Sequence, residues 1–438
     1  MPTGTVSTYL ERYAVAADQF ESLIPFLRRY SRGLCLPLRG EAHSSVLSLL
    51  NHLDTHLAPK NSPLVVVAVL NENLHSAPRF REIHQESVQA IKRSAFKQSG
   101  QFYLQRFSES VDILWIDYTN THAFAPKQGV GLARKAGCDL LLRIKQLNLL
   151  ESPWLWTTDA DARIPTDYFD LEESGHGAVH YTYNHDVSHF EGDEALTLYE
   201  IHLRYYVLGL LWANSPFAFP TIGSCLALHF EKYAQVRGFP DREAGEDFHL
   251  LNKLNKISKI RVRAGLPIIL RGRFSDRVPF GTGKATTEIH HLLKTGQLFS
   301  LYSPQAFEYL HSFLQGSRAI LDGDTSDLDG KLLEFRKTMA QSSPVSDTLF
   351  NELQIERILM EAMTSRRDTQ NRHLHFHGAF DGLKTLRLIH LLHQGHLRKQ
   401  DWRLALRSAP FCHFLSDFTC ARSALEQMRH QEETLICS

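Results

Sequence analysis

The fold is decided by the stretch Trp154–Pro165, WLWTTDADARIP. An apolar, β-prone run ends in two carboxylates one residue apart, and a proline soon ends the regular structure. Residues i and i+2 of a strand point to the same side, so we expect Asp159 and Asp161 to converge at the end of this strand. Two carboxylates that close repel each other, and a hard divalent cation between them removes the repulsion. The alternative is a solvated surface turn.

Strand and helix patterns alternate through the first 165 residues, with short connections between them. This alternation predicts βαβ units and a mostly parallel, doubly wound sheet flanked by helices. The predicted helices are 8–30, 44–57, 78–98 and 131–150, and the predicted strands are 33–38, 63–70, 111–117 and the run from Trp154. In such a fold, ligands bind along the carboxyl ends of the strands.

Polar side chains follow each of these strands, at the point where the apolar run ends. They are Arg39 and Glu41, Asn71–Asn73, Asp117, and finally Asp159 with Asp161. We therefore expect one crevice along this edge of the sheet.

The second half of the chain has a different pattern. We predict strands at 179–184, 223–230 and 257–270, and a helix at 193–212 that is buried against the sheet. An interfacial or lipid-facing helix is the alternative for 193–212. The loop 271–284 is rich in glycine and cations, and the rest is helical apart from a polar linker near 316–330. The expected domains are an N-terminal helical segment (1–30), an α/β domain (31–284) and an all-helical C-terminal domain (285–438).

Composition excludes several classes of protein. The 438 residues hold 48 basic and 48 acidic side chains, so non-specific attraction to nucleic acid is not expected. The six cysteines are scattered without a C-x-x-C pair, which indicates free thiols. No apolar run is long enough for a membrane span, and the N-terminus does not resemble a signal peptide. We expect a soluble, cytoplasmic protein.

Five motifs follow one another along the chain, namely Leu36–Glu41, Asn71–Asn73, Gly129–Gly137, Asp159–Asp161 and Gly238–Asp247. Together they resemble the GT-A fold of family 2 glycosyltransferases. Leu36–Glu41 resembles the opening "proline, then Asn-Glu", and Asn71 stands where the family has an aspartate that contacts the base. Gly129–Gly137 is similar to the "Gly, Ala-Arg-Asn, Gly" helix, with Arg134 as its arginine. Asp159-Ala160-Asp161 resembles the metal-binding D-x-D. Gly238–Asp247 resembles the "Gly-Phe, then Glu-Asp" segment.

This resemblance implies an enzyme that moves a sugar, as a hexosyltransferase of class EC 2.4 does, from a UDP- or GDP-sugar to an acceptor hydroxyl. Asp161, with Asp159, would bind Mg²⁺ or Mn²⁺, although Asp159 could instead bond the ribose. Asp247 would be the general base of an inverting transfer, and Glu246 would orient the acceptor. Helix capping is the structural alternative for both acids. The residues expected to bind the donor are Pro37, Arg39, Glu41, Asn71, Arg134 and Asp159. Arg277 and Lys284 are added to them from the loop 271–284, whose cations also include Arg271 and Arg273.

The sequence departs from the family at a few positions. Lys135 replaces the usual asparagine, and Asn71 replaces the usual aspartate. The Gln-x-x-Arg-Trp motif of processive synthases is absent, so repeated polymer extrusion is not expected. No histidine follows the last core strand, where Asp276 or Arg277 could take the place of a third metal ligand.

Several alternatives remain open at this stage. The loop 271–284 is either a mobile lid over the diphosphate or a plain connector. A nucleotidyltransferase and an inactive sugar-nucleotide-binding scaffold are the rival functions. His373, His375 and His377 would share one face of a strand but diverge on a helix, and a metal site there is the less favoured interpretation. The C-terminal helices would pack on the core or form a homodimer surface, and peripheral membrane contact stays open.

Overall fold

The computed structural model describes residues 4–58, 63–73, 78–172, 175–188, 190–275, 281–365 and 368–437. Contacts within the chain divide it into two units. Unit 1 comprises Met1–Phe190 and Thr221–Lys284, and unit 2 comprises Glu191–Pro220 and Ala285–Ser438. The domain boundaries at residues 31 and 285 stay a prediction.

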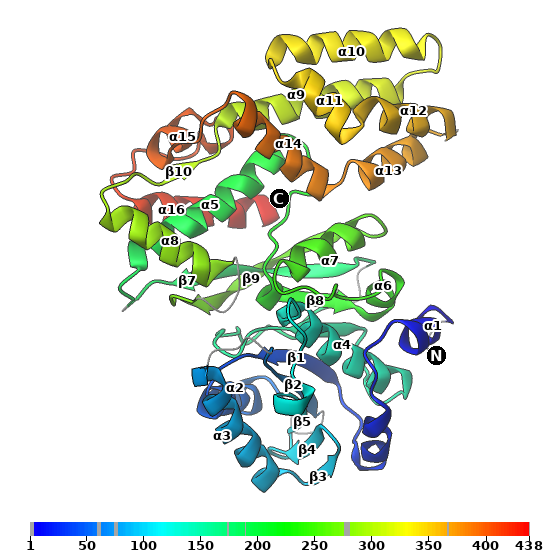
Figure 1. The fold of residues 1–438 in the computed structure, drawn as a ribbon, viewed down its shortest axis with the longest axis vertical. Helices are drawn as coiled ribbons and strands as arrows, with labels where there is room; N and C mark the ends of the chain where they lie inside the picture. Colours follow the sequence, from blue (N-terminus) through cyan, green and yellow to red (C-terminus); the bar gives the residue numbers. More distant parts are fainter. Residues whose placement is uncertain are drawn as a thin grey trace. The chain divides into compact units, whose positions relative to one another are not determined.

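Unit 1 is built on a sheet of nine strands (Figure 1). The strands are β1 (Arg32–Leu38), β2 (Leu64–Asn71), β3 (Lys97–Ser99), β4 (Phe102–Arg106), β5 (Val111–Tyr118), β6 (Trp154–Thr157), β7 (Ala178–Asp186), β8 (Leu226–His229) and β9 (Ile260–Arg271). Their order across the sheet is β3-β4-β5-β2-β1-β6-β8-β7-β9, and β4 and β8 run antiparallel to the strands beside them. The pairs β5–β2–β1–β6 and β7–β9 are parallel.

The central strands are apolar because helices cover them. All eight residues of β2 are buried, as its continuous run of valine and leucine predicts for a parallel strand. Helix α4 (Val130–Gln146) packs on β1 and β2, while α2 (His43–His56) packs on β5 and on α3 (Pro78–Ser94). In Figure 1, α2 and α3 lie on one side of these strands and α4 lies on the other. The predicted fold class, a mostly parallel α/β sheet flanked by helices, is confirmed.

The strand order indicates where this sheet would bind a ligand. From β1 the chain passes to β2 on one side, and later to β6 on the other, so the connections diverge between β1 and β6. The β1–β6 ladder ends at Cys35↔Thr157, two residues before Pro37, which has no N–H to donate to a neighbouring strand. Such a point, beyond the carboxyl ends of the strands, is where open α/β sheets bind ligands.

Two predicted helices of unit 1 are wrong in part. The segment 8–30 contains the end of α1 (Gly4–Arg12) and the 3-10 helix η1 (Asp18–Phe26), which includes Pro25. Helix α3 ends at Ser94, and Lys97–Arg106 forms the β3–β4 hairpin around Gly100, whose φ of 55° suits a tight turn. The remaining unit 1 helices are η2 (Asn120–His122), η3 (Gly223–Cys225), α6 (Phe230–Gln235) and α7 (Glu246–Asn255).

Unit 2 is a helical body with one apolar core. Its helices are α5 (Asp193–Trp212), α8 (Thr282–Lys294, beginning in unit 1), α9 (Pro304–Asp322), α10 (Leu328–Ser342), α11 (Ser346–Leu353), α12 (Ile355–Ser365), α13 (Thr369–Ala379), α14 (Gly382–Gly395), α15 (Trp402–Ser408), η4 (Pro410–Cys412) and α16 (Ala421–Cys437). The prediction of an all-helical region is nearly right, since the only strands described there are the short β10 (Ser300–Leu301) and β11 (Gln400–Asp401).

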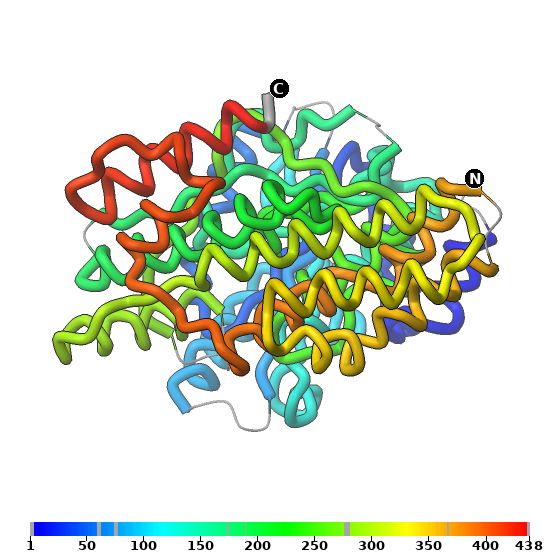
Figure 2. Tube along the Cα trace, turned by 90° about the horizontal axis from the view of Figure 1, so that it is seen from above, coloured from blue at the N-terminus to red at the C-terminus, as the bar shows by residue number. Residues whose placement is uncertain are grey.

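Two expectations about unit 2 need correction. Helix α5 is buried as predicted, but it packs on α9 and α16 and so belongs to the helical body. The predicted linker at 316–330 is shorter than expected, since α9 continues to Asp322, α10 begins at Leu328 and only 323–327 connects them. The two helices lie side by side (Figure 2). Gly316 makes this packing close, because a Cβ there would lie 2.3 Å from the Phe335 ring.

No helix in the described parts of the chain is long and apolar enough to cross a bilayer. The five cysteines whose side chains are described, Cys35, Cys138, Cys225, Cys412 and Cys420, are free thiols as predicted.

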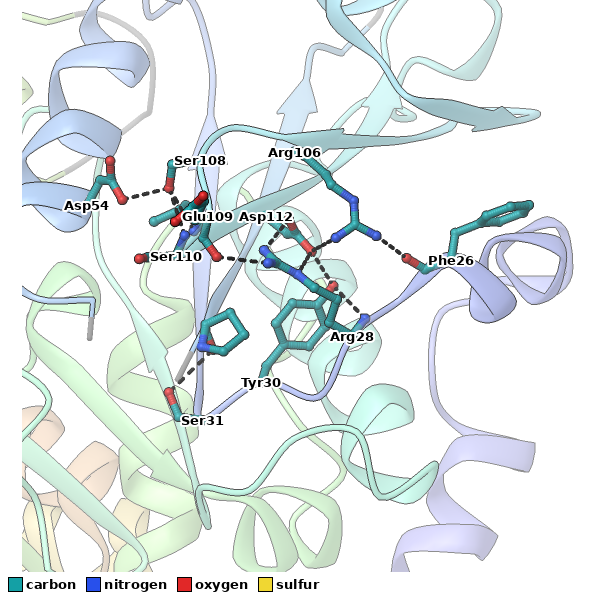
Figure 3. Close-up of polar contacts among 12 residues, drawn as sticks. Phe26, Arg28, Tyr30, Ser31, Asp54, Arg106, Ser108, Glu109, Ser110 and Asp112 are labelled. Carbon is teal, nitrogen blue, oxygen red and sulfur yellow. Dashed lines mark hydrogen bonds and ion pairs between the residues drawn. The ribbon is translucent and has the colours of Figure 1, made fainter. Parts of the chain in front are cut away.

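A buried carboxylate fixes the segment that leads into β1. Asp112 on β5 is fully buried and accepts hydrogen bonds from Arg28 Nε and Nη2, at 2.9 and 2.6 Å, and from Tyr30 Oη at 2.8 Å (Figure 3). Arg106 Nη1 lies 3.9 Å from the same carboxylate. Burial, followed by the charge of Asp112, raises the pKa of Tyr30, so this hydroxyl stays protonated and keeps donating.

Asp112→Ala should lower the free energy of unfolding by about 2–4 kcal/mol, because it leaves Arg28 and Tyr30 without their buried acceptor. Urea denaturation measures the loss. The control is Asp170→Ala, which removes an exposed carboxylate 3.6 Å from Arg32 and should cost less than about 1 kcal/mol. Equal losses in the two variants would contradict a structural role for the buried group.

Candidate functional site

Asp159 and Asp161 lie in the turn that follows β6. The strand ends at Thr157, and the Ala162 amide donates to the Asp159 carbonyl at 3.1 Å, so the two acids belong to a turn and not to the strand itself. Paired backbone hydrogen bonds of 2.9 Å between Arg163 and Ile269 fix this turn against β9. The turn therefore stands at the crevice beyond β1 and β6.

Arg134 is the centre of the site. Its three guanidinium nitrogens donate to Glu246 Oε1 at 3.0 Å, to Thr157 Oγ1 at 2.7 Å and to Asp159 Oδ1 at 2.7 Å. The arginine side chain is only 4% exposed, whereas Asp159 is 39% exposed. Burial alone would lower the pKa of Arg134, but the charges of Asp159 and Glu246 outweigh it and raise the pKa. The guanidinium is therefore a permanent charge that joins three separate elements.

Two glycines let Arg134 reach this position. Gly131, in the first turn of α4, donates its amide to the Arg242 carbonyl at 3.1 Å, and a Cβ there would lie 2.6 Å from the Pro240 carbonyl oxygen. Gly223 lies against the guanidinium, since its Cβ would be 3.0 Å from Arg134 Nε. Larger residues would separate α4 from the 240–246 segment and break the Arg134–Glu246 contact.

Glu246 and Asp247 begin helix α7, one residue after Gly245, whose φ of 71° turns the chain into the helix. Burial, followed by the charge of Asp247, raises the pKa of Glu246 to about 7 despite Arg134. Burial also raises the pKa of Asp247, while hydrogen bonds from backbone amides such as that of Phe248, at 2.7 Å, oppose the rise. Asp247 thus accepts a hydrogen bond from a backbone amide in the first turn of α7, which agrees in part with the helix-capping alternative. Its charge also acts on Arg134.

A second arginine contacts the other acid of the D-x-D. Arg273, two residues beyond β9, donates from Nη1 to Asp161 Oδ2 at 2.5 Å, and its Nη2 lies 3.5 Å from Glu41 Oε1. Glu41 also accepts from the backbone amide of Arg39 at 2.5 Å. The structure thus brings the predicted residues Glu41 and Asp161 together through an arginine that was not among the predicted site residues.

The turn after β1 rests on a histidine that sequence reasoning missed. Gly40, with a φ of 75°, donates its amide to His84 Nε2 at 2.8 Å, and His84 Nδ1 lies 3.4 Å from Glu72 Oε2. Glu72 in turn accepts from the Asn120 amide at 2.7 Å. His84 and Glu72 are buried. No local motif marks His84, because it lies within the ordinary amphipathic pattern of α3.

The remaining predicted donor-binding residues occupy different places. Pro37 is buried inside β1, and Asn71 Nδ2 donates to the Leu38 carbonyl at 2.8 Å, so this amide ties the ends of β1 and β2 together. Lys284 lies in the first turn of α8, which corrects the prediction that 271–284 is loop throughout. Arg277 and Asp276 lie outside the described residues.

The histidine-rich segment is helical, so the three alternating histidines do not share a strand face. His373 Nε2 lies 2.7 Å from Asp322 Oδ1, and burial lowers the pKa of His377 to about 4. Among the residues described here, no group of three or more His, Cys, Asp and Glu side chains is arranged to hold a metal ion.

Comparison with known proteins gives distant structural similarities only. No family model and no curated protein matches the chain. S. aureus TarS, residues 1–349, aligns over 92% of this chain and 91% of its own, with 13% identity and a TM-score of 0.35. Mannosyltransferase PcManGT from Pyrobaculum calidifontis, in complex with GDP-Man and Mn²⁺, aligns over 87% and 92%, with 14% identity and a TM-score of 0.32.

The contribution of Glu246 to the stability of the protein should fall as the pH rises from 4.5 to about 7, because its folded-state pKa, about 7, lies above its ordinary value of 4.5. Between these values the native state holds a proton that the unfolded state has released, so this stability is full below pH 4.5 and is lost by about pH 7. Urea unfolding from pH 5 to 8 should show the decline, and Glu246→Gln should flatten it. Glu151→Gln, at an exposed position, serves as control. An unchanged slope in Glu246→Gln would contradict this assignment.

Proposed function

We propose that the chain is a GT-A type glycosyltransferase that moves a sugar from a nucleotide-diphosphate sugar to an acceptor hydroxyl, with inversion. The observation that carries the proposal is the buried Arg134, which joins the D-x-D acid Asp159 to Glu246 at the crevice beyond β1 and β6. Three motifs far apart in the sequence meet through one side chain. A solvated surface turn, which was the alternative for Asp159, would not be paired with a buried arginine such as Arg134.

The acids of the crevice suit Mg²⁺ or Mn²⁺. These ions prefer oxygen ligands and commonly bind through one or two carboxylates, completed by substrate phosphates and water, so a cage of three protein ligands is not required. Asp161 and Glu41 already share one cation, the Arg273 guanidinium. We assign Asp161, supported by Asp159, as the residues that hold the metal, which would act as a Lewis acid on the leaving diphosphate.

Asp247 is the proposed general base. As the acceptor oxygen forms its bond to the anomeric carbon, the bond from that carbon to the donor phosphate oxygen breaks, and the nucleoside diphosphate leaves with the electron pair. The hydroxyl proton passes to the Asp247 carboxylate. The burial that raises the pKa of Asp247 makes it a stronger proton acceptor than an exposed aspartate. Direct displacement with one base and no enzymic nucleophile inverts the anomeric centre.

We assign Arg134 a positioning role in addition to the predicted contact with the donor. Three of its five N–H groups donate to protein oxygens, and these bonds hold Asp159 and the start of α7 relative to each other. Glu246 is held by Arg134 and orients the acceptor. Donor contacts are proposed for the residues at the carboxyl edge of the sheet and beyond β9, namely Pro37, Arg39, Glu41, Asn71, Arg277 and Lys284.

A panel of UDP- and GDP-sugars with Mn²⁺ should raise the melting temperature, most strongly for the true donor. A ligand at one hundred times its Kd stabilises the native state by about 2.7 kcal/mol. Differential scanning fluorimetry measures the shift, and Asp161→Ala should remove its dependence on metal. A transferase releases a nucleoside diphosphate, whereas a nucleotidyltransferase releases pyrophosphate. Absence of a shift with every sugar nucleotide would contradict the proposal.

Asp247→Asn should bind the donor with a Kd within about twofold of wild type but lose about 10²–10⁴-fold in kcat, because it removes the proton acceptor alone. Donor binding is measured calorimetrically and turnover by release of nucleoside diphosphate. The matched control is Asp241→Asn, an exposed acid of the preceding loop that pairs with Gln128. Undiminished turnover in Asp247→Asn would remove Asp247 from its role.

A further inference from the structure

The two acids of the D-x-D differ in how their arginine partners are held. Arg134, which contacts Asp159, is 4% exposed and is bonded to three protein oxygens. Arg273, which contacts Asp161, is 37% exposed and comes from a segment beyond the end of β9. Asp161 itself is 18% exposed, and Glu41 is 11% exposed. The contact of Arg273 with Asp161 can therefore be exchanged, whereas Arg134 is fixed.

We propose that Arg273 is an internal competitor for the divalent cation at Asp161, and that the diphosphate of the nucleotide removes this competition by accepting the arginine. This inference rests on the proposed function and adds a coupling to it. If Arg273 competes with the metal in this way, metal and nucleotide bind cooperatively, and Arg273 is the side chain that couples them.

The competition follows from charge and geometry. Arg273 Nη1 is 2.5 Å from Asp161 Oδ2, and the same guanidinium reaches toward Glu41. A divalent cation that took Asp161 as a ligand would stand beside the guanidinium charge of Arg273, and the two cations repel. Metal binding at Asp161 thus requires Arg273 to move away. If no other anion accepts Arg273, this movement costs its contacts with the Asp161 and Glu41 carboxylates.

A diphosphate changes this balance. The planar guanidinium presents donors whose spacing matches two phosphate oxygens, so a displaced Arg273 gains bonds at least as strong as those it gave up. Its partial exposure leaves it room to turn. The nucleotide therefore raises the affinity for metal, and by reciprocity the metal raises the affinity for nucleotide by the same factor. Arg273 acts as a positioning residue that prevents tight metal binding before the donor arrives.

The test is an Mn²⁺ titration followed by electron paramagnetic resonance, with and without saturating UDP or GDP. Without nucleotide, Arg273→Ala should bind Mn²⁺ about tenfold more tightly than wild type. The gain in Mn²⁺ affinity that nucleotide causes should shrink by a similar factor in this variant. Arg273→Gln, which keeps the length of the side chain without its charge, should behave like Arg273→Ala.

The matched control is Arg163→Ala. Arg163 also follows the D-x-D and also bonds an aspartate, Asp186 at 2.6 Å, but it has no described contact with Asp161. Its removal should leave the Mn²⁺ affinity within about twofold of wild type. Circular dichroism of each variant confirms that the fold is intact.

Two negative results are distinguishable. If wild type binds Mn²⁺ with nucleotide, but both Arg273 variants bind it unchanged or more weakly without nucleotide, the competition is overturned while the proposed function stands. If neither wild type nor the Arg273 variants bind Mn²⁺ under any condition, the metal-dependent function itself is contradicted.

Discussion

The ion pairs of one buried arginine organise the site. Arg134 is held in a region almost without solvent, where an unpaired charge would be strongly destabilising, and two carboxylates and a threonine hydroxyl satisfy it. Each partner comes from a different element: the end of β6, the turn after it, and the start of α7. The requirement to neutralise this charge fixes the relative positions of these elements and so determines the geometry of the crevice.

The fold supplies the conditions for that arrangement. The connections diverge between β1 and β6, and the carboxyl ends of strands at such a point are where open α/β sheets bind ligands. The N-terminal segment is fastened elsewhere, through Asp112 on β5 and through Asp139, which accepts from Tyr9 at 2.6 Å. These two buried carboxylates are structural, because they hold the N-terminal segment against β5 and α4.

The sequence allowed the α/β class, the D-x-D and the acidic pair of α7 to be predicted, because buried strands and acids after apolar runs are local patterns. The contact of Arg134 with Glu246 was not predicted, because the two residues are 112 positions apart in the sequence and no local pattern links them. Arg273 and His84 were not predicted as site residues, since their roles depend on tertiary contacts with Asp161 and Gly40. The β3–β4 hairpin was missed because Lys97–Ser99 is short and polar. The two acids of the D-x-D differ in their partners. Asp159 pairs with the buried Arg134, whereas Asp161 pairs with the partly exposed Arg273.

The central claim is that the crevice beyond β1 and β6 holds a nucleoside diphosphate and its metal. A crystal structure with Mn²⁺ and UDP or GDP, with data collected at the manganese absorption edge, tests it most directly. The account predicts an anomalous peak beside Asp161, with the diphosphate next to it and Arg273 turned from Asp161 to a phosphate oxygen. Nucleotide or manganese bound elsewhere on the chain, with Asp161 still paired to Arg273, would contradict it.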